Sequence, residues 1–245
     1  DLQAASDYAV ALTGAASTWS GGDMAGGGST VIASGGALDM SGGSRSFGGR
    51  TLTVNSGGAL VWSGGNVELF GGASTIANSG SFTISAVASM ADGSVSCCDG
   101  AGTLTLSNLA AGTITKTGAS TSTIGSGITV TSAGTLNITG GLLLFNGTSS
   151  SSAGSVTVDT GATLQYAAGS HALSGLSGAG TLSLAGNTLG LTGINAISNY
   201  TQSNGTLTNA GAMTVNGALT LSGGTLSGAG SVTLSGPSST WSGGD

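Results

Sequence analysis

Short runs of alternating polar and aliphatic residues recur along the whole chain, about one run to every seven or eight positions, and Gly, Ser or Asn bounds each run. Glycine interrupts almost every window, so no amphipathic helical stripe survives. Alternation between turn residues predicts short β-strands. The strand spacing is too tight for most β-sandwiches and fits a coil of three short strands. Examples are residues 51–54, 103–106, 134–138, 155–158, 181–184 and 231–234.

A coil of three such strands predicts a repeat period of about 22 residues. The first third of the chain has this period. Residues 34–43 read SGGALDMSGG, and residues 56–65 read SGGALVWSGG one period later. A looser third copy follows at residues 78–85. Stacked coils would align the apolar positions into three columns: Leu38, Leu60 and Phe82; Met40, Trp62 and Ile84, with Trp19 at the end; and Ile32, Val54 and Ile76.

Stacking is needed because one coil is too thin to bury its own aliphatic side chains, whereas a pile of coils forms a continuous core. The sequence therefore predicts an all-β fold, a right-handed parallel β-helix (β-solenoid) with about 22 residues per coil and ten to eleven coils. The handedness follows from the strong preference of parallel crossover connections. Residues 1–245 are expected to form one continuous domain.

A longer repeat is superimposed on the coils. Residues 9–23 match residues 231–245 at ten of fifteen positions, with an offset of 222. This match predicts one large unit, 9–230, which ten coils would supply, followed by the start of a second copy at 231–245. Such a chain could belong to a tandem array, or it could stack end to end with copies of itself.

Two segments break the rhythm, residues 86–99 and 149–153, and both are expected to be loops or bulges that protrude from the rod. Asp23 and Arg45 are separated by one coil period and could pair on the outer surface. An outward Thr-x-Thr rank could order water, but Thr51 and Thr53 would be flanked by Ser29/Val31 and Ala73/Thr75. This broken rank argues against ice binding.

Composition excludes several function classes. Charged residues make up only 5% of the chain, against roughly 25% in a typical domain, and the net charge is −6. The basic residues are Arg45, Arg50 and Lys116, too few to track a phosphate backbone. No apolar run approaches the roughly 20 residues of a membrane-spanning helix. We therefore expect neither nucleic-acid binding nor membrane insertion.

No enzymatic site, metal site or cofactor is predicted. His171 is the single histidine, no G-x-S-x-G motif accompanies it, and a solvated or corner position is the simpler interpretation. Glycoside hydrolysis requires two facing carboxylates. Asp39 and Glu68 do not share a column, and Asp92 and Asp99 match no catalytic spacing.

The remaining candidates have structural explanations. The Gly-Gly-Asp triplets that end at Asp23 and Asp245 are expected to be turns, since a calcium-binding β-roll needs consecutive nine-residue repeats. Cys97 and Cys98 are adjacent; one could point inward and one outward, or they could form a disulfide within or between chains. Trp19, Trp62 and Trp241 are expected in core columns and not in a carbohydrate site.

The motif at residues 176–184 (LSGAGTLSL) recurs closely at 226–234 and 100–106. It resembles the glycine-rich repeats of autotransporter passenger regions and of filamentous-haemagglutinin-like exoproteins. The resemblance implies a secreted or cell-surface bacterial protein that serves as a rigid rod, spacer or adhesin. A self-assembling filament subunit is the alternative, and a carbohydrate-active β-helix enzyme is a more distant one. Expected partners are the chain itself, neighbouring repeats, or an unidentified cell-surface or glycan ligand.

Overall fold

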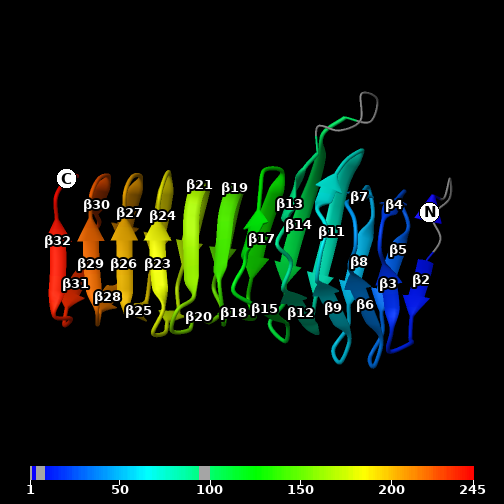
Figure 1. Ribbon diagram of the computed structural model, residues 1–245, viewed down its shortest axis with the longest axis horizontal. Coiled ribbons are helices and arrows are strands. Elements are labelled where there is room, and N and C mark those ends of the chain that lie inside the picture. Colours follow the sequence, from blue (N-terminus) through cyan, green and yellow to red (C-terminus); the bar gives the residue numbers. More distant parts are fainter. Residues whose placement is uncertain (1, 4–8, 94–99) are drawn as a thin grey trace.

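A computed structural model describes residues 2–3, 9–93 and 100–245. These residues form a β-solenoid of about 11 turns with roughly 21 residues per turn and no helix. The strands lie side by side along the long axis, and the two ends of the chain lie at opposite ends of the rod (Figure 1). The predicted all-β parallel solenoid is therefore confirmed.

The strands stack on three faces, and the chain visits face 1, face 2 and face 3 in that order in every turn. Face 1 holds β1 (Leu2–Gln3), β4 (Gly22–Ala25), β7 (Arg45–Gly48), β10 (Val67–Leu69), β13 (Ser89–Asp92), β16 (Thr121–Ile124), the first part of β19 (Leu142–Ser152), the first part of β21 (Thr163–Leu173), β23 (Thr181–Leu184), β26 (Asn199–Gln202), β29 (Ala218–Leu221) and β32 (Ser238–Trp241).

Face 2 holds β2 (Ala9–Leu12), β5 (Ser29–Ile32), β8 (Thr51–Val54), β11 (Gly72–Asn78), β14 (Gly102–Asn108), β17 (Ile128–Ser132), the second parts of β19 and β21, β24 (Thr188–Leu191), β27 (Thr206–Asn209) and β30 (Thr225–Ser227). Face 3 holds β3 (Ser17–Trp19), β6 (Ala37–Met40), β9 (Ala59–Trp62), β12 (Ser81–Ile84), β15 (Thr113–Lys116), β18 (Thr135–Ile138), β20 (Val156–Val158), β22 (Leu176–Ser177), β25 (Ile194–Ile197), β28 (Ala212–Val215) and β31 (Ser231–Leu234).

The inward side chains form one continuous core along the rod. Strand alternation supplies it, because every second residue of each strand points inward. The first predicted column is confirmed, since Leu60 pairs with Leu38 on one side and Phe82 on the other. The second is confirmed in the same way around Trp62. Each buried Leu or Ile contributes about 1.5–3 kcal/mol relative to exposure.

The third predicted column is wrong in its last member. Val54 pairs with Asn78, and Ile76 pairs instead with Leu52. The link between β10 and β11 is longer than the equivalent link between β7 and β8. The link between β11 and β12 is shorter than the one between β8 and β9 by the same number of residues. Ile76 remains buried, but the inward position at the end of β11 belongs to an asparagine.

Turn length varies along the rod. Leu38 pairs with Leu60 near the start, 22 residues away, whereas Leu184 pairs with Gln202 in the second half, 18 residues away. The last turn is slightly longer again, since Leu221 pairs with Trp241, 20 residues away. The turn that runs from Met90 to its strand partner Ile124 is the expanded exception. Most of its extra residues lie between β13 and β14. The predicted interruption at 86–99 is narrower than expected, because Ser89–Asp92 is a strand. Residues 94–99 lie outside the described residues.

The second predicted loop, residues 149–153, is wrong. Ser149 to Ser152 form the second part of β19, paired with β17 on one side and β21 on the other. The alternating pattern did not predict this strand, because its inward positions are occupied by Ser150 and Ser152 and not by aliphatic residues. The run is therefore part of face 2.

The long repeat does not span a whole number of turns. Residues 9–12 form β2 on face 2, whereas the matching residues 231–234 form β31 on face 3. Eleven strands from β3 to β31 occupy face 3, which makes ten turns between those two strands. The matching segments are therefore ten and one third turns apart, because the later turns are shorter than the first ones.

Candidate functional site

The acidic candidates are dispersed over the rod. Asp39 lies on face 3, where it accepts a hydrogen bond of 2.6 Å from the Ser63 hydroxyl, and Glu68 lies on face 1. The structure therefore does not bring these two together, in agreement with the sequence analysis. Asp99 lies outside the described residues.

One pair of acids that the sequence did not single out shares a shallow hollow. Glu68 and Asp92, on neighbouring strands β10 and β13, line a cavity of about 180 Å³ together with Asn66 and Ser89. The Asp92 carboxylate accepts a hydrogen bond from the Gly102 backbone N–H at 3.2 Å. Asp92 thus anchors the return of the chain from the insertion, and this hollow is where acid chemistry could be sought.

His171 lies inside the core and not at a solvated corner, which corrects the expected position. Its Nδ1 lies 2.8 Å from the Ser150 hydroxyl and its Nε2 lies 2.8 Å from the Ala168 carbonyl oxygen. Since that carbonyl can only accept, Nε2 carries the proton and Nδ1 accepts from Ser150. The ring packs against Tyr166, with centroids 4.3 Å apart, and Phe145 lies 6.0 Å away.

This Ser–His contact has a structural explanation. Both side chains are buried, so a substrate cannot reach the hydroxyl. Burial lowers the pKa of His171 below its ordinary value of 6.5. The neutral imidazole therefore satisfies a buried serine and fills space beside the rings, which is the role of a core residue.

All three basic side chains are buried, and the predicted surface pair of Asp23 with Arg45 is wrong. Arg45 lies inward, donates to the Gly43 carbonyl at 2.9 Å, contacts the Ser41 carbonyl, and stands 5.7 Å from the centre of the Trp19 ring. Burial lowers the pKa of the Arg45 guanidinium. The head group reaches the carbonyls at a corner, while the aliphatic stem packs in the core.

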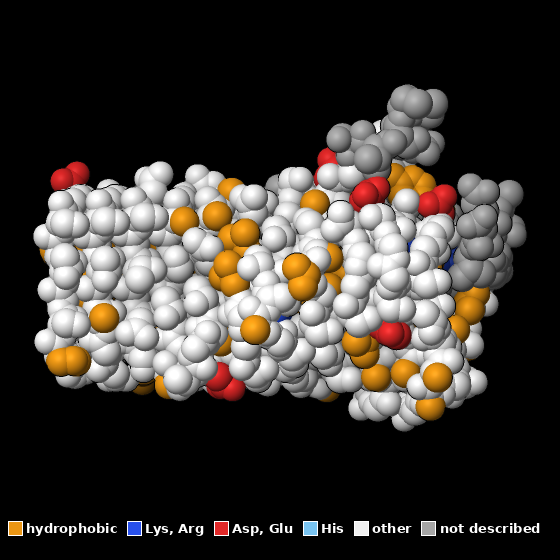
Figure 2. All heavy atoms as spheres, in the orientation of Figure 1, with side chains coloured by type: hydrophobic (Ala, Val, Ile, Leu, Met, Phe, Trp, Pro, Cys, Tyr) orange, Lys and Arg blue, Asp and Glu red, His pale blue; other side chains and the backbone are white. Residues whose placement is uncertain are grey.

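Arg50 and Lys116 follow the same rule. Arg50 donates through Nε to the Thr30 hydroxyl at 3.0 Å. Lys116 places Nζ 2.6 Å from the Thr117 carbonyl oxygen and 3.3 Å from that of Gly118, and burial lowers its pKa. The chain therefore exposes no lysine or arginine. More acidic side chains gather in the N-terminal half of the visible surface, and most of the rest is uncharged (Figure 2).

An inward polar ladder at the end of face 2 was missed by the sequence analysis. Asn78 donates to the Asn108 side-chain oxygen at 2.8 Å, and Asn108 donates to the Ser132 hydroxyl at 3.0 Å. The Asn108 amide also binds the Thr135 carbonyl at 3.0 Å, so each rung ties face 2 to face 3. The signal in the sequence is an Asn two residues before a glycine, as at Asn78 and Asn209, where the Asn side-chain oxygen accepts a hydrogen bond from the N–H of Gly80 or Gly211.

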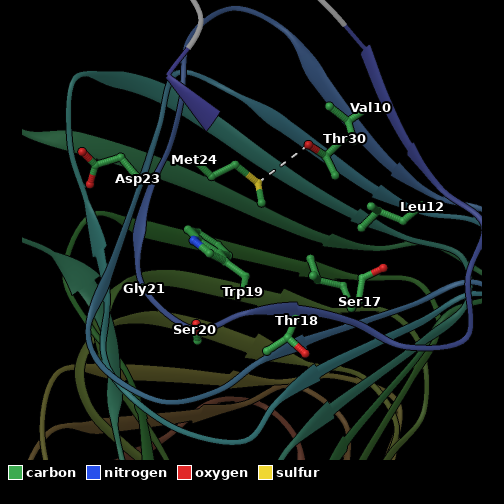
Figure 3. A pocket seen from close by; sticks show the side chains of 11 residues that line it. Val10, Leu12, Ser17, Thr18, Trp19, Ser20, Gly21, Asp23, Met24 and Thr30 are labelled. Carbon is green, nitrogen blue, oxygen red and sulfur yellow. Dashed lines mark hydrogen bonds between the residues drawn. The ribbon is translucent and has the colours of Figure 1, made fainter. Parts of the chain in front are cut away.

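The tryptophan prediction holds for two of three residues. Trp19 and Trp62 lie in the core. Trp241 is 59% exposed, because it lies on β32 and no later turn stacks on it. At the other end of the rod, Trp19 helps to line a cavity of about 260 Å³ with Leu12, Met24 and Thr30 (Figure 3). Its lining mixes apolar side chains with those of Ser17, Thr30 and Asp23, and it lies where the core columns begin.

Outward hydroxyls on face 2 are more regular than the sequence spacing predicted. The partners of Thr51 and Thr53 on β11 are Thr75 and Ala77, not Ala73 and Thr75. One column then carries only Ser or Thr through ten consecutive turns: Ser29, Thr51, Thr75, Thr105, Thr129, Ser149, Ser170, Thr188, Thr206 and Thr225. The adjacent column remains mixed, with Val31, Ala77, Ala172 and Gly190 among its members.

Asp23 lies within strand β4 and not in the expected turn, and Asp245 lies near the opposite end of the rod, where its N–H donates to the Gly224 carbonyl. Cys97 and Cys98 lie outside the described residues. Over residues 2–3, 9–93 and 100–245, no three His, Cys, Asp or Glu side chains gather into a group able to hold a metal ion.

Comparison with known protein families, curated proteins and solved structures returns no match. In the described part of the chain there is also no helix with the length and apolarity to cross a membrane. The residues and their geometry are therefore the sole basis for a functional hypothesis.

Proposed function

We propose that this chain is a structural segment of a secreted bacterial surface protein or extracellular filament, in which it serves as a rigid rod, spacer or adhesin. The observation that carries the proposal is the single apolar core that all three faces share along the rod. Each turn is held by its neighbours through parallel strand pairing, so bending the rod would break ladders on three faces together. This is the mechanical property that a spacer requires.

The outer surface supports the same proposal. Its basic side chains are all buried, so Ser, Thr, Gly and a few acids make up most of the surface, together with the exposed apolar side chains of Val87, Leu109 and Ile194. A surface without exposed basic groups does not attract phosphate backbones. Such a rod can project from a cell, and a specific ligand would then bind at the hollow beside Glu68 and Asp92.

Negative-stain electron microscopy across a concentration series tests this function. A structural segment predicts discrete rods about 50 Å long at every concentration, since eleven turns are stacked about 4.8 Å apart. Globular particles would contradict it. Release of reducing sugars from a polysaccharide panel, abolished by Glu68→Gln or Asp92→Asn, would instead establish the carbohydrate-active alternative.

A self-assembling filament subunit is the second candidate. The observation that favours it is the match between residues 9–23 and residues 231–245 at ten of fifteen positions. Parallel strand edges in two such similar segments would favour stacking of one copy on another. Long unbranched fibres in the same concentration series would support this alternative over the isolated rod.

A further inference from the structure

We propose that face 2 is an ice-binding surface, on which one column of outward hydroxyl groups holds water in the arrangement of an ice lattice. This function is additional to that of the rod and does not depend on what the rod displays elsewhere. The surface lies along the body of the molecule, from β5 to β30, and involves neither end of the chain.

Strand pairing makes the column regular. Each of the ten strands from β5 to β30 on face 2 presents a Ser or Thr at the same outward position, and each of these residues is the direct partner of the next. Paired strands lie about 4.8 Å apart, so the hydroxyl groups repeat at that distance along the rod. Oxygen atoms in ice repeat at a similar distance along one axis of the hexagonal lattice. The column therefore places its hydroxyls at a spacing that a row of lattice water can follow.

The hydroxyl groups of this column are available to solvent. None of its ten members is buried, and within the described part of the chain none of their hydroxyls has a hydrogen-bond partner. Corner hydroxyls differ, since those of Thr139 and Ser174 lie 3.0 Å and 3.1 Å from the carbonyl oxygens of Lys116 and Ser152 in the turn before. The column hydroxyls thus keep their full capacity to bind water.

Threonine makes the column rigid. Seven of the ten members are Thr, whose branched side chain is restricted at its first torsion angle. A row of hydroxyls that is already fixed by the sheet loses little freedom when water becomes ordered on it. The binding surface is therefore formed before it meets the crystal.

A second column widens the surface in the middle of the rod. The outward position two residues further along the strand also carries a hydroxyl on β14, β17 and β19, at Ser107, Thr131 and Ser151. Two residues of a strand span about 6.6 Å, so these three turns present a grid of hydroxyls and not a single row. On the other strands the second column holds nothing larger than valine. No long side chain in either column would hold an ice surface away.

The other two faces lack this combination. Face 1 carries Asp23 and Glu68 at outward positions, and face 3 carries Asp39. The described strands of face 2 contain no Asp, Glu, Lys or Arg. Its two outward columns also contain no aromatic ring, the group on which a bound sugar would pack. Face 2 therefore fits ordered water better than it fits a polysaccharide.

Partition into growing ice tests the inference. Ice is grown slowly from a dilute solution that contains the full chain and, as a reference, an unrelated soluble protein of similar size. The chain should be enriched in the ice while the reference stays in the liquid, and a single ice crystal in its solution should show thermal hysteresis, a gap between its melting and freezing temperatures. Exclusion of the chain from ice as complete as that of the reference overturns the proposal.

A variant of face 2 assigns the binding to the column. Thr51→Lys, Thr129→Lys and Thr188→Lys are combined, because these members are not adjacent and each Lys places a long, strongly hydrated group on the column. The variant should lose enrichment in ice and most of the thermal hysteresis. Circular dichroism near 0 °C shows whether the β-structure is retained.

The matched control carries the same three changes of residue type on another face. Thr83→Lys, Thr157→Lys and Thr214→Lys lie at outward positions of β12, β20 and β28 on face 3, and they add the same charge. This control should bind ice as the unchanged chain does. Equal retention or equal loss of ice binding in the two variants overturns the assignment to face 2.

A milder change covers the case in which the Lys variant fails to fold. Thr129→Val removes one hydroxyl from the centre of the grid and keeps the branched shape that suits a strand. It should reduce thermal hysteresis in a folded chain, whereas Thr83→Val should not, and equal hysteresis in these two variants overturns the proposal. Retention of the chain on insoluble cellulose or chitin together with exclusion from ice would make the partner a polysaccharide, which also overturns it. These outcomes leave the rod function intact, because the length of the particles in electron microscopy tests that function separately.

Discussion

Two regions of the rod differ in the number of residues per turn and in the side chains that fill their cores. In the wide region, residues 9–92, long turns such as the one from Leu38 to Leu60 enclose tryptophans, phenylalanines and the two arginines. In the narrow region, residues 163–245, shorter turns such as the one from Leu184 to Gln202 enclose mainly leucine, isoleucine and valine. The number of residues per turn sets the cross-section, and the cross-section decides which side chains fit.

The comparison also explains where charge can be buried. A wide turn leaves room at its corners for a long stem and for a head group surrounded by backbone carbonyls, as at Arg45. Beyond Lys116 the chain has no basic residue. In the narrow region amides bind the corner carbonyls, as where Gln202 donates to the carbonyls of Gly205 and Thr225.

The largest effect should come from emptying the wide core. Trp62→Ala is expected to lower the free energy of unfolding by about 3–5 kcal/mol. Leu182→Ala in the narrow region should cost less, since the smaller side chain leaves a smaller cavity. Urea denaturation of both variants measures the difference. Outward Thr83→Ala is the control and should change stability by less than about 0.5 kcal/mol; an equal loss for Trp62→Ala and Leu182→Ala would contradict the difference in width.

Tight corners in the narrow region should come next. A Cβ added at Gly211 would lie 2.0 Å from the Gly193 carbonyl oxygen, whereas one at Gly190 would meet nothing closer than 3.7 Å. Gly211→Ala should therefore destabilise the chain by about 1–3 kcal/mol through overpacking, and Gly190→Ala should be tolerated. Thermal unfolding followed by circular dichroism compares them, and similar melting temperatures would show that the turns are less closely stacked.

The asparagine ladder should give a somewhat smaller loss. Asn108→Ala removes hydrogen bonds to Asn78, Ser132 and Thr135, and leaving buried partners unsatisfied costs about 1–3 kcal/mol. Asn209→Ala in the narrow region should cost less, since the Asn209 side chain bonds to the backbone of Ser231 and Gly211 and adds no rung to a neighbouring side chain. Urea midpoints rank the two variants. A larger loss at Asn209 would overturn the view that the ladder is concentrated in the middle of the rod.

The smallest effect concerns pH. Because burial depresses the pKa of His171 in the folded state, the fold binds fewer protons than the unfolded chain. The stability that neutral His171 provides is present above the unfolded pKa of about 6.5 and is lost as the pH falls below it. Unfolding free energies at pH 7.5 and 5.0 should differ, and His171→Asn should reduce that difference. A drop of the same size in His171→Asn would assign it to other groups.

Sequence periodicity reveals a column only where turns have equal length. The columns around Leu60 and Trp62 were predictable because β6, β9 and β12 repeat at a constant spacing. The pairing of Val54 with Asn78 instead of Ile76 was not predictable. The residues gained at one corner are lost at the next, so the overall period is unchanged. Inward serines hid the second part of β19 for a related reason, since polarity masked the alternation.

The sites were less predictable than the fold. Charged residues in an alternating pattern are normally expected to face solvent. Nothing in the sequence therefore indicated that Arg45 and Lys116 would lie inside, with their charged groups bound to backbone carbonyls. Glu68 and Asp92 lie close together because of the way β10 pairs with β13. This pairing could not be predicted from a constant repeat length, because the turn that follows is expanded. The burial of His171 follows from its pairing with Ser150 on β19, a strand that the sequence had assigned to a loop.

A pair of cross-links tests the central claim, that one axis carries both wide and narrow turns. Thr163 pairs with Thr181, whereas a turn as long as the one from Leu38 to Leu60 would pair it with Ala185. With Cys97 and Cys98 replaced by serine, Thr163→Cys with Thr181→Cys should form a disulfide, as should Asp39→Cys with Val61→Cys in the wide region. Thr163→Cys with Ala185→Cys should remain reduced. A disulfide in that last variant, and none with Thr181→Cys, would contradict a solenoid whose turns differ in length.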